Sequence, residues 1–207
     1  MFDIIIIGAG VIGAAIARNL ACYSYRILVL EKENDVGDGT SCANSAILHS
    51  GYDPEPGTKK AYYNVRGNAM YDQLCAELDV QIRRTGSLTL ANSDEEILVL
   101  KQLKERAKQN NVPVELLSSE QVRQIEPFVA DEVKMALFAP TAGIVNPFEL
   151  VIALMENAMD NGVELHLNEK VTGLKKKDAS FLIETTKAKY ETKMVINAAG
   201  IHCDEID

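Results

Sequence analysis

The residues with the clearest chemistry lie near the N-terminus, where glycines are spaced as Gly8, Gly10 and Gly13 and a glutamate follows at Glu31. Gly8 permits a tight turn from strand to helix, Gly10 lets the backbone approach a pyrophosphate, and Gly13 lets the helix pack closely on a sheet. The phosphates would then lie over unpaired N–H groups at the helix N-terminus. The Glu31 carboxylate can accept hydrogen bonds from both hydroxyls of an adenosine ribose and would repel a 2′-phosphate, which favours FAD or NAD over NADP.

A strand, a helix and a second strand must hold these residues in place. The apolar run at residues 4–7 predicts the first strand, and the run at residues 27–30 predicts the second, which ends at Glu31. Between them, apolar residues recur at helical spacing: Ile12, Ala15, Ile16 and Leu20. Because the glycines follow a strand and open a helix, the pattern favours a βαβ dinucleotide-binding unit over a hydrophobic core with incidental glycines.

Composition narrows the class of protein. The chain has 207 residues, 47% of them hydrophobic, which is enough for a substantial core. The formal net charge of −9 argues against a nucleic-acid partner and against attraction to anionic lipid. The apolar start lacks a basic segment and is interrupted by glycines and Arg18, so we expect neither a secretory signal nor a transmembrane segment.

The cysteines and histidines are few. No CxxC pair occurs among the four cysteines, so we expect reduced thiols in the cytoplasm and neither a disulfide framework nor a metal site. His49 lies beside a glycine turn, after a loop of small and hydroxyl-bearing residues at 37–46. From these residues alone, the loop is either a ligand-binding segment or solvated surface, and His49 is either functional or structural. His166 and His202 have no evident carboxylate or cysteine partner nearby in the sequence, and we interpret both as structural.

The rest of the chain is predicted more coarsely. Helices are expected at residues 59–78, 95–109 and 148–161, and strands at 87–90, 133–138, 163–167, 170–174, 181–184 and 194–197. Two helices have an expected apolar face: Tyr63, Met70, Leu74 and Leu78 in the first, and Val151, Ile152, Met155 and Met159, pointing inward, in the last. Residues 118–121 form a capping box for a short helix that should stop before Pro127.

Several segments together resemble a known family. They are Gly8-Ala9-Gly10-Val11-Ile12-Gly13, Glu31-Lys32, Thr40-Ser41, Ala43-Asn44-Ser45, His49-Ser50-Gly51, Pro56-Gly57, Lys60-Ala61 and Asn197-Ala198-Ala199-Gly200. They resemble the FAD-dependent oxidoreductases of the D-amino-acid oxidase, or glycine oxidase-like, superfamily, and most closely its flavin-dependent glycerol-3-phosphate dehydrogenases and oxidases. Related 2-hydroxyglutarate oxidases share the run from Thr40 to Gly51.

The resemblance implies a fold and a set of cofactor-binding residues. The fold is α/β: a Rossmann-like FAD-binding domain at residues 1–80 and 143–207, with an inserted, incomplete α+β substrate domain at residues 81–142. His49 would be the base that takes the substrate's hydroxyl proton while hydride leaves carbon for the flavin. The residues implied to bind FAD are Gly8, Gly10, Ile12, Gly13, Glu31, Lys32, Thr40, Ser41, Asn44, Ser45, Val171, Ala198, Ala199 and Gly200.

The resemblance also implies an activity. The expected reaction is oxidation of glycerol 3-phosphate, a small anionic alcohol, to dihydroxyacetone phosphate. Oxidation of 2-hydroxyglutarate and a non-catalytic dinucleotide-binding module remain alternatives, and the electron acceptor could be a quinone, oxygen or an iron–sulfur protein. Because relatives continue beyond Asp207, we expect an N-terminal fragment with weakened FAD affinity, from a protein that could lie peripherally on a membrane when complete.

Two groups of residues bear on the expected substrate and on the flavin environment. Four basic residues either hold the substrate phosphate or form a solvated face: Lys59, Lys60, Arg83 and Arg84. Cys42 and Ala46 stand where relatives often carry other residues, with glycine common at the second position. A change in flavin potential or oxygen reactivity would follow.

Overall fold

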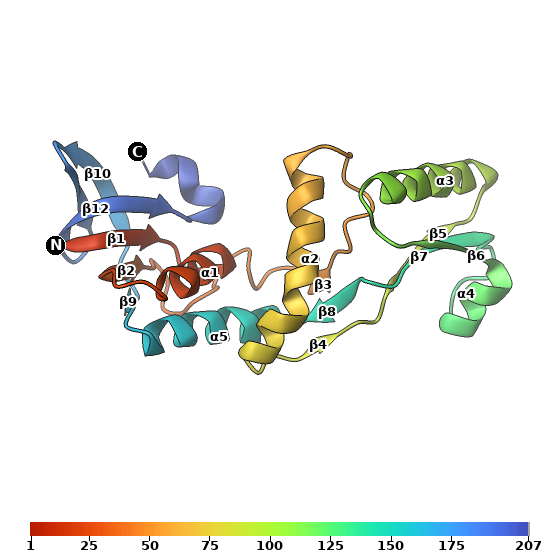
Figure 1. The fold of residues 1–207 in the computed structure, drawn as a ribbon, viewed down its shortest axis with the longest axis horizontal. Coiled ribbons are helices and arrows are strands. Elements are labelled where there is room, and N and C mark those ends of the chain that lie inside the picture. The colour runs from red at the N-terminus through yellow and green to blue at the C-terminus, as the bar shows by residue number, and fades with distance from the viewer. Residues whose placement is uncertain (207) are drawn as a thin grey trace. The chain divides into compact units, whose positions relative to one another are not determined.

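The computed structural model describes residues 1–206, which form two compact units. The first unit consists of Met1–Ser45, Leu78–Val80 and the segment from Asn146 onward, and the second consists of Ala46–Glu77 and Gln81–Val145. Figure 1 shows the elements of each unit. The assignment of nucleotide and substrate domains to residues 1–80, 81–142 and 143–207 is functional, and it stays a prediction.

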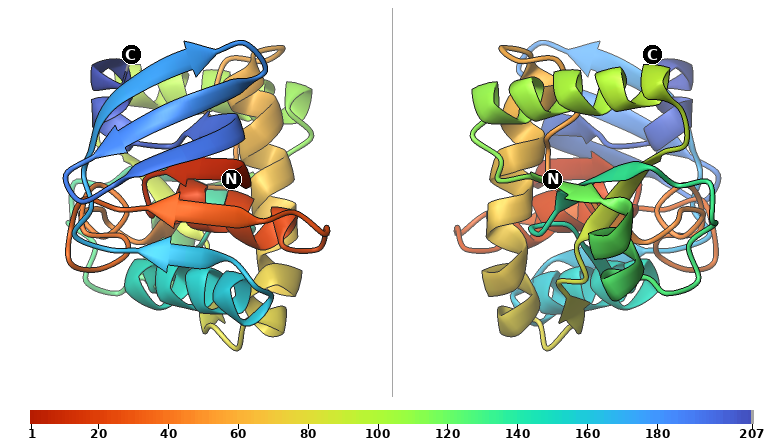
Figure 2. Two further views of the ribbon diagram at one scale, coloured as in Figure 1. Left: turned by 90° about the vertical axis from the view of Figure 1, so that its left-hand side faces the viewer. Right: turned by 90° about the vertical axis from the view of Figure 1, so that its right-hand side faces the viewer.

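A six-stranded sheet forms the centre of the first unit, with the strand order β10-β11-β12-β1-β2-β9. Four neighbouring strands, β12, β1, β2 and β9, run parallel, while β10 and β11 are antiparallel additions. The left view of Figure 2 shows these strands side by side. Their bounds are β1 Phe2–Ile7, β2 Ile27–Leu30, β9 Glu164–His166, β10 Val171–Lys177, β11 Ser180–Thr185 and β12 Lys189–Asn197. The predicted α/β fold is confirmed, and parallel pairing dominates its sheet.

Two helices of this unit, α1 (Val11–Leu20) and α5 (Pro147–Asp160), pack against each other. Helix α5 begins at Pro147, one residue before the predicted start, because the Asn146 side chain accepts a hydrogen bond from the Phe148 N–H at 3.0 Å and proline occupies the first turn. A short 3₁₀ helix, η1 (Gly200–Glu205), follows β12.

The predicted inward face of α5 is partly wrong, and α1 is buried through its smallest residues. In α5, Val151 and Met155 are buried as expected, but Ile152 and Met159 are 40% and 46% exposed, and other residues complete the buried face: Leu150, Leu154 and Ala158. In α1, Ile12 is 63% exposed. The buried residues of α1 are the small ones: Gly13, Ala14 and Ala17. Close packing at Gly13 leaves room only for small side chains on the inner face of α1, so the larger apolar residue is placed outside.

The second unit contains two three-stranded antiparallel sheets and three helices. One sheet has the order β3-β8-β4 and the other the order β5-β7-β6. The strand bounds are β3 Ile47–Leu48, β4 Ile82–Arg83, β5 Ser87–Ala91, β6 Glu115–Ser118, β7 Met135–Ala139 and β8 Gly143–Val145. The helices are α2 (Lys59–Glu77), α3 (Asp94–Gln109) and α4 (Ser119–Ile125).

Alternation along β7 explains how two helices cover the β5-β7-β6 sheet. Leu137 belongs to a buried cluster with Leu100 of α3, whereas Ala136 belongs to a cluster with Val122 of α4. Successive strand residues point to opposite faces, so α3 and α4 pack on opposite sides of the sheet, as Figure 1 shows. The capping box of α4 is confirmed: the Ser118 hydroxyl accepts from Gln121 N–H, and the Gln121 side chain accepts from Ser118 N–H.

Helix α2 begins at Lys59 as predicted and ends at Glu77, one residue before the predicted end. Of its predicted apolar face, Leu74 is half-buried, as is Leu78 just beyond the helix, but the other two residues are exposed. Tyr63 and Met70 are 64% and 57% exposed. The buried residues of the helix are Ala61, Asn68 and Cys75. They recur every seven residues, and this spacing puts them on one face.

Over residues 1–206, no helix combines the length and apolar character needed to cross a membrane. The four cysteines are all unpaired thiols. Burial raises the pKa of the Cys75 thiol. Among the described residues, no three histidine, cysteine or carboxylate side chains gather closely enough to hold a metal ion.

Candidate functional site

The glycine-rich turn joins β1 to α1 in the first unit. Gly8 has a φ of +101°, in the region that favours glycine, and a Cβ at this position would lie 2.5 Å from the carbonyl oxygen of Ala198. A Cβ on Gly13 would collide with the carbonyl oxygen of Gly8. The turn and the close helix packing are therefore those expected from the sequence, while the contribution of these glycines to pyrophosphate binding stays a prediction.

Gly10 caps the N-terminus of α1, where the space in front of the backbone N–H groups of the first turn is open. Within 4 Å, a Cβ on Gly10 would meet only the Ser41 hydroxyl oxygen, at 3.0 Å. Gly10 is the N-cap and has no side chain to accept from the first turn, so the Val11 N–H donates to Ser41 Oγ at 2.9 Å instead. Open space before N–H groups at the positive end of a helix is suited to an anionic group such as a pyrophosphate.

The loop from Thr40 to Ser45 is irregular, as predicted. Ser41 is half-buried and faces the start of α1, whereas Thr40, Asn44 and Ser45 are exposed. The Asn44 side-chain amide donates to the carbonyl of Ser41 at 2.6 Å and braces the loop from within. Ser41 therefore reaches the glycine-rich turn through its bond with the Val11 N–H.

Glu31 is buried at the end of β2, and both of its carboxylate oxygens accept backbone hydrogen bonds. Oε2 accepts from the Ala9 N–H at 2.7 Å, and Oε1 accepts from the Glu33 N–H at 3.0 Å. The carboxylate therefore holds the glycine-rich turn directly, a contact that the sequence analysis missed. Each oxygen retains a second lone pair, so the same carboxylate can also accept from a ribose hydroxyl.

Backbone bonds fix Glu31 on both sides. Its N–H donates to the His166 carbonyl at 2.9 Å, and its carbonyl accepts from the Glu169 N–H at 2.8 Å. The next residue, Lys32, is exposed and pairs with Glu33 at 3.3 Å. Lys32 Nζ also lies 3.3 Å from His202 Nε2.

The Ala198-Ala199-Gly200 segment meets the glycine-rich turn at the end of β12. The Ala198 N–H donates to the Ile7 carbonyl at 2.9 Å, and the Ala198 backbone crowds Gly8. Gly200 has a φ of +60° and opens η1. Residues about 190 positions apart in the chain thus lie together because β12 and β1 are paired. Val171 lies in the buried core with β1 and β2 residues, beside a bulge at the start of β10.

His49 lies in the second unit, on a turn just after β3, with its side chain exposed. Its carbonyl accepts from Asn68 Nδ2 at 2.9 Å. Ser50 is buried, and its hydroxyl has no hydrogen-bond partner within residues 1–206. Gly51 has a φ of +93°, and a Cβ at this position would lie 2.7 Å from Val65 Cγ2. The histidine is thus presented on a tightly fixed turn.

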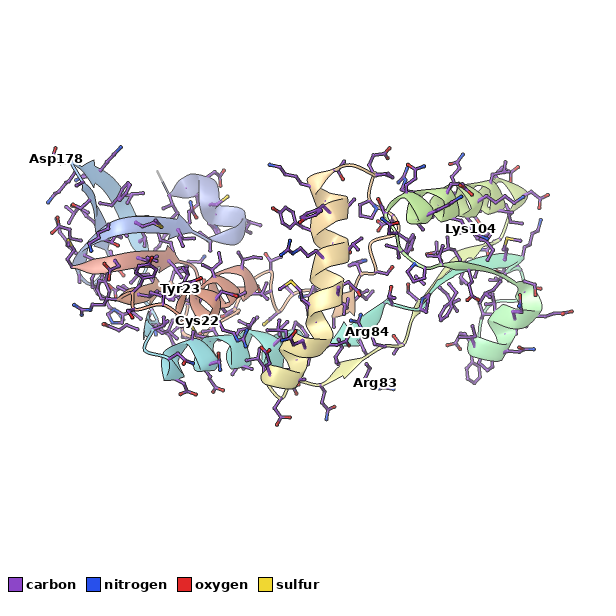
Figure 3. The ribbon with its side chains drawn as sticks, viewed as in Figure 1. Cys22, Tyr23, Arg83, Arg84, Lys104 and Asp178 are labelled. Carbon is purple, nitrogen blue, oxygen red and sulfur yellow. The ribbon has the colours of Figure 1, made fainter. Side chains whose placement is uncertain are left out.

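The basic residues considered for a substrate phosphate differ in whether other protein groups already bond their side chains. Arg84 is engaged by Asp72, Asn68 and Thr141, so it is neither free for a phosphate nor part of a merely solvated face. Figure 3 shows Arg84 beside α2 and Arg83 pointing away from it. Lys59 and Lys60, at the start of α2, are exposed.

The interpretation of His166 and His202 as lacking carboxylate partners was wrong. His166 Nδ1 lies 3.3 Å from Glu169 Oε2, and His202 Nδ1 lies 2.7 Å from Glu205 Oε1. Both partners follow three residues later, a spacing visible in the sequence. His166 also bonds the Tyr190 hydroxyl at 3.0 Å, and desolvation of that phenol, with hydrogen bonding to Glu169, raises the pKa of Tyr190 to about 12. These contacts give both histidines structural partners.

The sequence departs from the family pattern at Ala46 and Cys42, and the structure shows the backbone conformation of the first and the surroundings of the second. Ala46 has a φ of +61°, in the left-handed region that favours glycine. The expected glycine at this position is therefore explained by backbone conformation. Cys42 is half-buried, and desolvation, together with the nearby Asp38 charge, raises the pKa of its thiol.

Comparisons with known proteins assign this arrangement to a family. Residues 3–207 match the family described as FAD dependent oxidoreductase. A glycerol 3-phosphate dehydrogenase of Caloramator mitchellensis is 50% identical over 208 residues, covering 100% of this chain and 43% of that protein. An L-2-hydroxyglutarate dehydrogenase of Escherichia coli strain K12 is 29% identical over 209 residues, covering 100% of this chain and 49% of that protein.

Solved structures agree. The dithionite-reduced L-alpha-glycerophosphate oxidase of Mycoplasma pneumoniae, with FAD bound, superimposes with a TM-score of 0.93 and 29% identity, over 99% of this chain and 55% of that one. The present chain spans about half the length of these relatives. The match over residues 3–207, together with the glycine-rich turn and Glu31, shows that the chain belongs to the FAD dependent oxidoreductase family.

Proposed function

We propose that this chain carries the FAD-binding part of a flavoprotein that oxidises glycerol 3-phosphate to dihydroxyacetone phosphate. The observation that carries the cofactor assignment is the buried Glu31 carboxylate, which lies 2.7 Å from the Ala9 N–H of the glycine-rich turn. This contact supports a role for Glu31 as ribose acceptor next to a phosphate-binding turn, which is the arrangement that a dinucleotide requires. The space at Gly10 supports the same assignment.

The other predicted cofactor residues follow from this placement. Ser41 and the N-terminus of α1 would hold the pyrophosphate, and Ala198 would let the backbone approach the cofactor closely. The remaining predicted residues are proposed as further contacts: Ile12, Lys32, Thr40, Asn44, Ser45, Val171, Ala199 and Gly200. When bound, FAD supplies the hydride acceptor; the protein binds it, orients it and removes the substrate proton.

His49 is proposed as the base for the substrate hydroxyl. Imidazole is the commonest general base in enzymes, and the His49 ring is exposed on a fixed turn. The electrons of the C–H bond leave carbon as hydride, while the hydroxyl proton passes to the imidazole, so the alcohol becomes a ketone. The proposed domain division follows the same logic, with residues 1–80 and 143–207 serving the cofactor and 81–142 the substrate.

Two other functions make different predictions. Oxidation of 2-hydroxyglutarate is favoured by the likeness to the E. coli dehydrogenase, at lower identity than the likeness to the glycerol 3-phosphate enzyme. A module that binds a dinucleotide without catalysis would need no base at His49.

We also propose a reducing compartment such as the cytoplasm, on the support of four unpaired thiols.

The test is the visible spectrum of the purified chain after addition of FAD, before and after anaerobic addition of substrate. We expect a bound flavin spectrum, at a weaker affinity than in full-length relatives, since the chain spans about half their length. Bleaching by glycerol 3-phosphate and not by 2-hydroxyglutarate supports the proposal, and the reverse selects the alternative.

His49→Gln is the control for catalysis. It should retain bound flavin and lose bleaching. A flavin that stays oxidised with every substrate, in the unaltered chain and in the variant alike, favours the binding module. Absence of bound flavin contradicts the cofactor assignment.

A further inference from the structure

Asn68 is a buried polar residue on α2 whose side chain is almost fully hydrogen-bonded. Its Nδ2 donates to the His49 carbonyl at 2.9 Å and to the Thr141 carbonyl at 3.0 Å. Its Oδ1 accepts from Arg84 at 3.1 Å. Burying an amide is unfavourable unless such partners are present, so this side chain is held in one orientation.

Arg84 completes the network around Asn68. Its guanidinium makes two parallel bonds to Asp72, Nε to Oδ1 at 3.1 Å and NH2 to Oδ2 at 2.7 Å. It also donates to the Asn68 carbonyl at 3.0 Å and to the Thr141 carbonyl at 2.6 Å. Hydrogen bonding to Arg84 lowers the pKa of the Asp72 carboxyl. The side chain of Arg84 is only 26% exposed, and its planar fork fits this set of acceptors in a way that a lysine would not.

A second asparagine fixes the other end of the His49 turn. Asn110 Nδ2 donates to the Gly51 carbonyl at 3.1 Å and to the Pro54 carbonyl at 2.8 Å. Two asparagine side chains therefore hold the carbonyls on either side of the buried Ser50. The His49 ring itself makes no hydrogen bond within the described part of the chain, so its backbone is fixed while its imidazole is free.

We propose that Asn68, held by Arg84, is the positioning residue for His49. The inference rests on the proposed role of His49 as the base. Fixing the backbone through the carbonyl restricts where the imidazole can lie without occupying either ring nitrogen. A proton acceptor must be held in this way, because a displacement of about 1 Å can cost about 10²-fold in rate.

The test uses the chain's three histidines, whose ring signals can be resolved by NMR without FAD or substrate. The signal of His49 is assigned by its absence in His49→Gln. Asn68→Asp keeps the side-chain size but removes both donors, and Arg84→Met removes the fork that holds Asn68. Arg83→Met is the matched control, because Arg83 is the adjacent arginine and its side chain makes no hydrogen bond within residues 1–206.

We expect one sharp set of His49 signals in the unaltered chain and in Arg83→Met, and broadened or doubled signals in Asn68→Asp and Arg84→Met. The signals of His166 and His202 come from the first unit and should stay unchanged, which shows that the effect is confined to the second unit. Circular dichroism of each variant, compared with that of the unaltered chain, checks that the second unit is folded. Unchanged His49 signals in a folded Asn68→Asp overturn the proposal. If Asn68→Asp does not fold, Arg84→Lys decides in the same way, since it keeps the charge but loses the parallel bonds to Asp72.

A kinetic readout separates positioning from general stability. In flavin-loaded chain that is bleached by substrate, Asn68→Asp should lower the bleaching rate by about 10²-fold at saturating substrate without changing FAD affinity. An equal loss of FAD affinity would indicate a structural role alone and would contradict positioning. If no substrate bleaches the flavin, the proposed activity fails, while the NMR comparison still tests the clamp on His49.

Discussion

Replacing Glu31 with glutamine tests whether one carboxylate both holds the glycine-rich turn and prepares the ribose site. Glutamine has nearly the same size but offers one acceptor oxygen where glutamate offers two. Whichever way the amide turns, either the Ala9 N–H or the Glu33 N–H faces an NH₂ group. Glu31 is 9% exposed, so water cannot easily replace the lost acceptor.

The magnitude follows from this geometry. A buried donor left unpaired costs about 1–3 kcal/mol, so we expect the free energy of unfolding without FAD to fall by about 2 kcal/mol. For a chain of this length the corresponding drop in Tm is roughly 4–8 °C. Glu33→Gln is the matched control: its side chain is 40% exposed and pairs only with Lys32, so its effect should stay within about 0.5 kcal/mol.

Urea unfolding followed by circular dichroism measures both variants, without FAD and with it. Bound FAD stabilises the folded chain according to its dissociation constant, by about 2.7 kcal/mol at one hundred times that constant. Loss of a ribose acceptor should weaken FAD binding by about 10-fold or more, so Glu31→Gln should gain less from the same FAD concentration. Equal urea midpoints for Glu31→Gln, Glu33→Gln and the unaltered chain without FAD would refute the reasoning.

Three further perturbations test other contacts. Gly13→Ala places a methyl group against the Gly8 carbonyl and should lower the free energy of unfolding by about 3 kcal/mol. Gly67→Ala in α2 is the control: its methyl group would meet nothing within 4 Å, so it should raise the free energy of unfolding by about 0.5 kcal/mol. Urea midpoints that move alike in the two variants would contradict this reasoning. Ala46→Gly should relieve a φ of +61° and raise the free energy of unfolding by up to about 1 kcal/mol, measured in the same way, and a loss would show that the strain is not real. Burial alone would raise the pKa of Glu169, but hydrogen bonds from Thr185 and Tyr190 outweigh burial and lower that pKa. The ionised Glu169 therefore stabilises the fold above the pKa of the unfolded chain, about 4.3, and this stabilisation is lost as pH falls through the pKa of the folded chain. Thr185→Val should therefore cost about 1 kcal/mol at pH 7 and progressively less in acid, and a deficit independent of pH would rule out Glu169 as the cause.

Local patterns were enough to predict much of the fold. The glycine spacing, the flanking apolar runs and Glu31 predict the βαβ unit because each acts within a few residues of itself. The same holds for the α4 capping box, whose two partners are three residues apart. Where the signal was local but overlooked, as with His166 and Glu169, the sequence contained it at a spacing of three.

Which face of each helix is buried depended on its neighbours in space. Ile12 is exposed because α1 packs through Gly13 and small residues, and Tyr63 and Met70 are exposed because α2 packs through Ala61, Asn68 and Cys75. Hydrophobic periodicity identifies a helix, but it does not say which of two apolar stripes meets the rest of the protein.

The sequence by itself determined the βαβ unit and the residue types that suit a dinucleotide, because these depend on local spacing. Only the tertiary structure decided that Ala198 lies against Gly8, that Glu31 holds Ala9, and that Asn68, itself bonded by Arg84, holds the His49 carbonyl. Strand pairing and burial bring these groups together across long stretches of chain, and a buried polar group takes whichever partner that packing supplies.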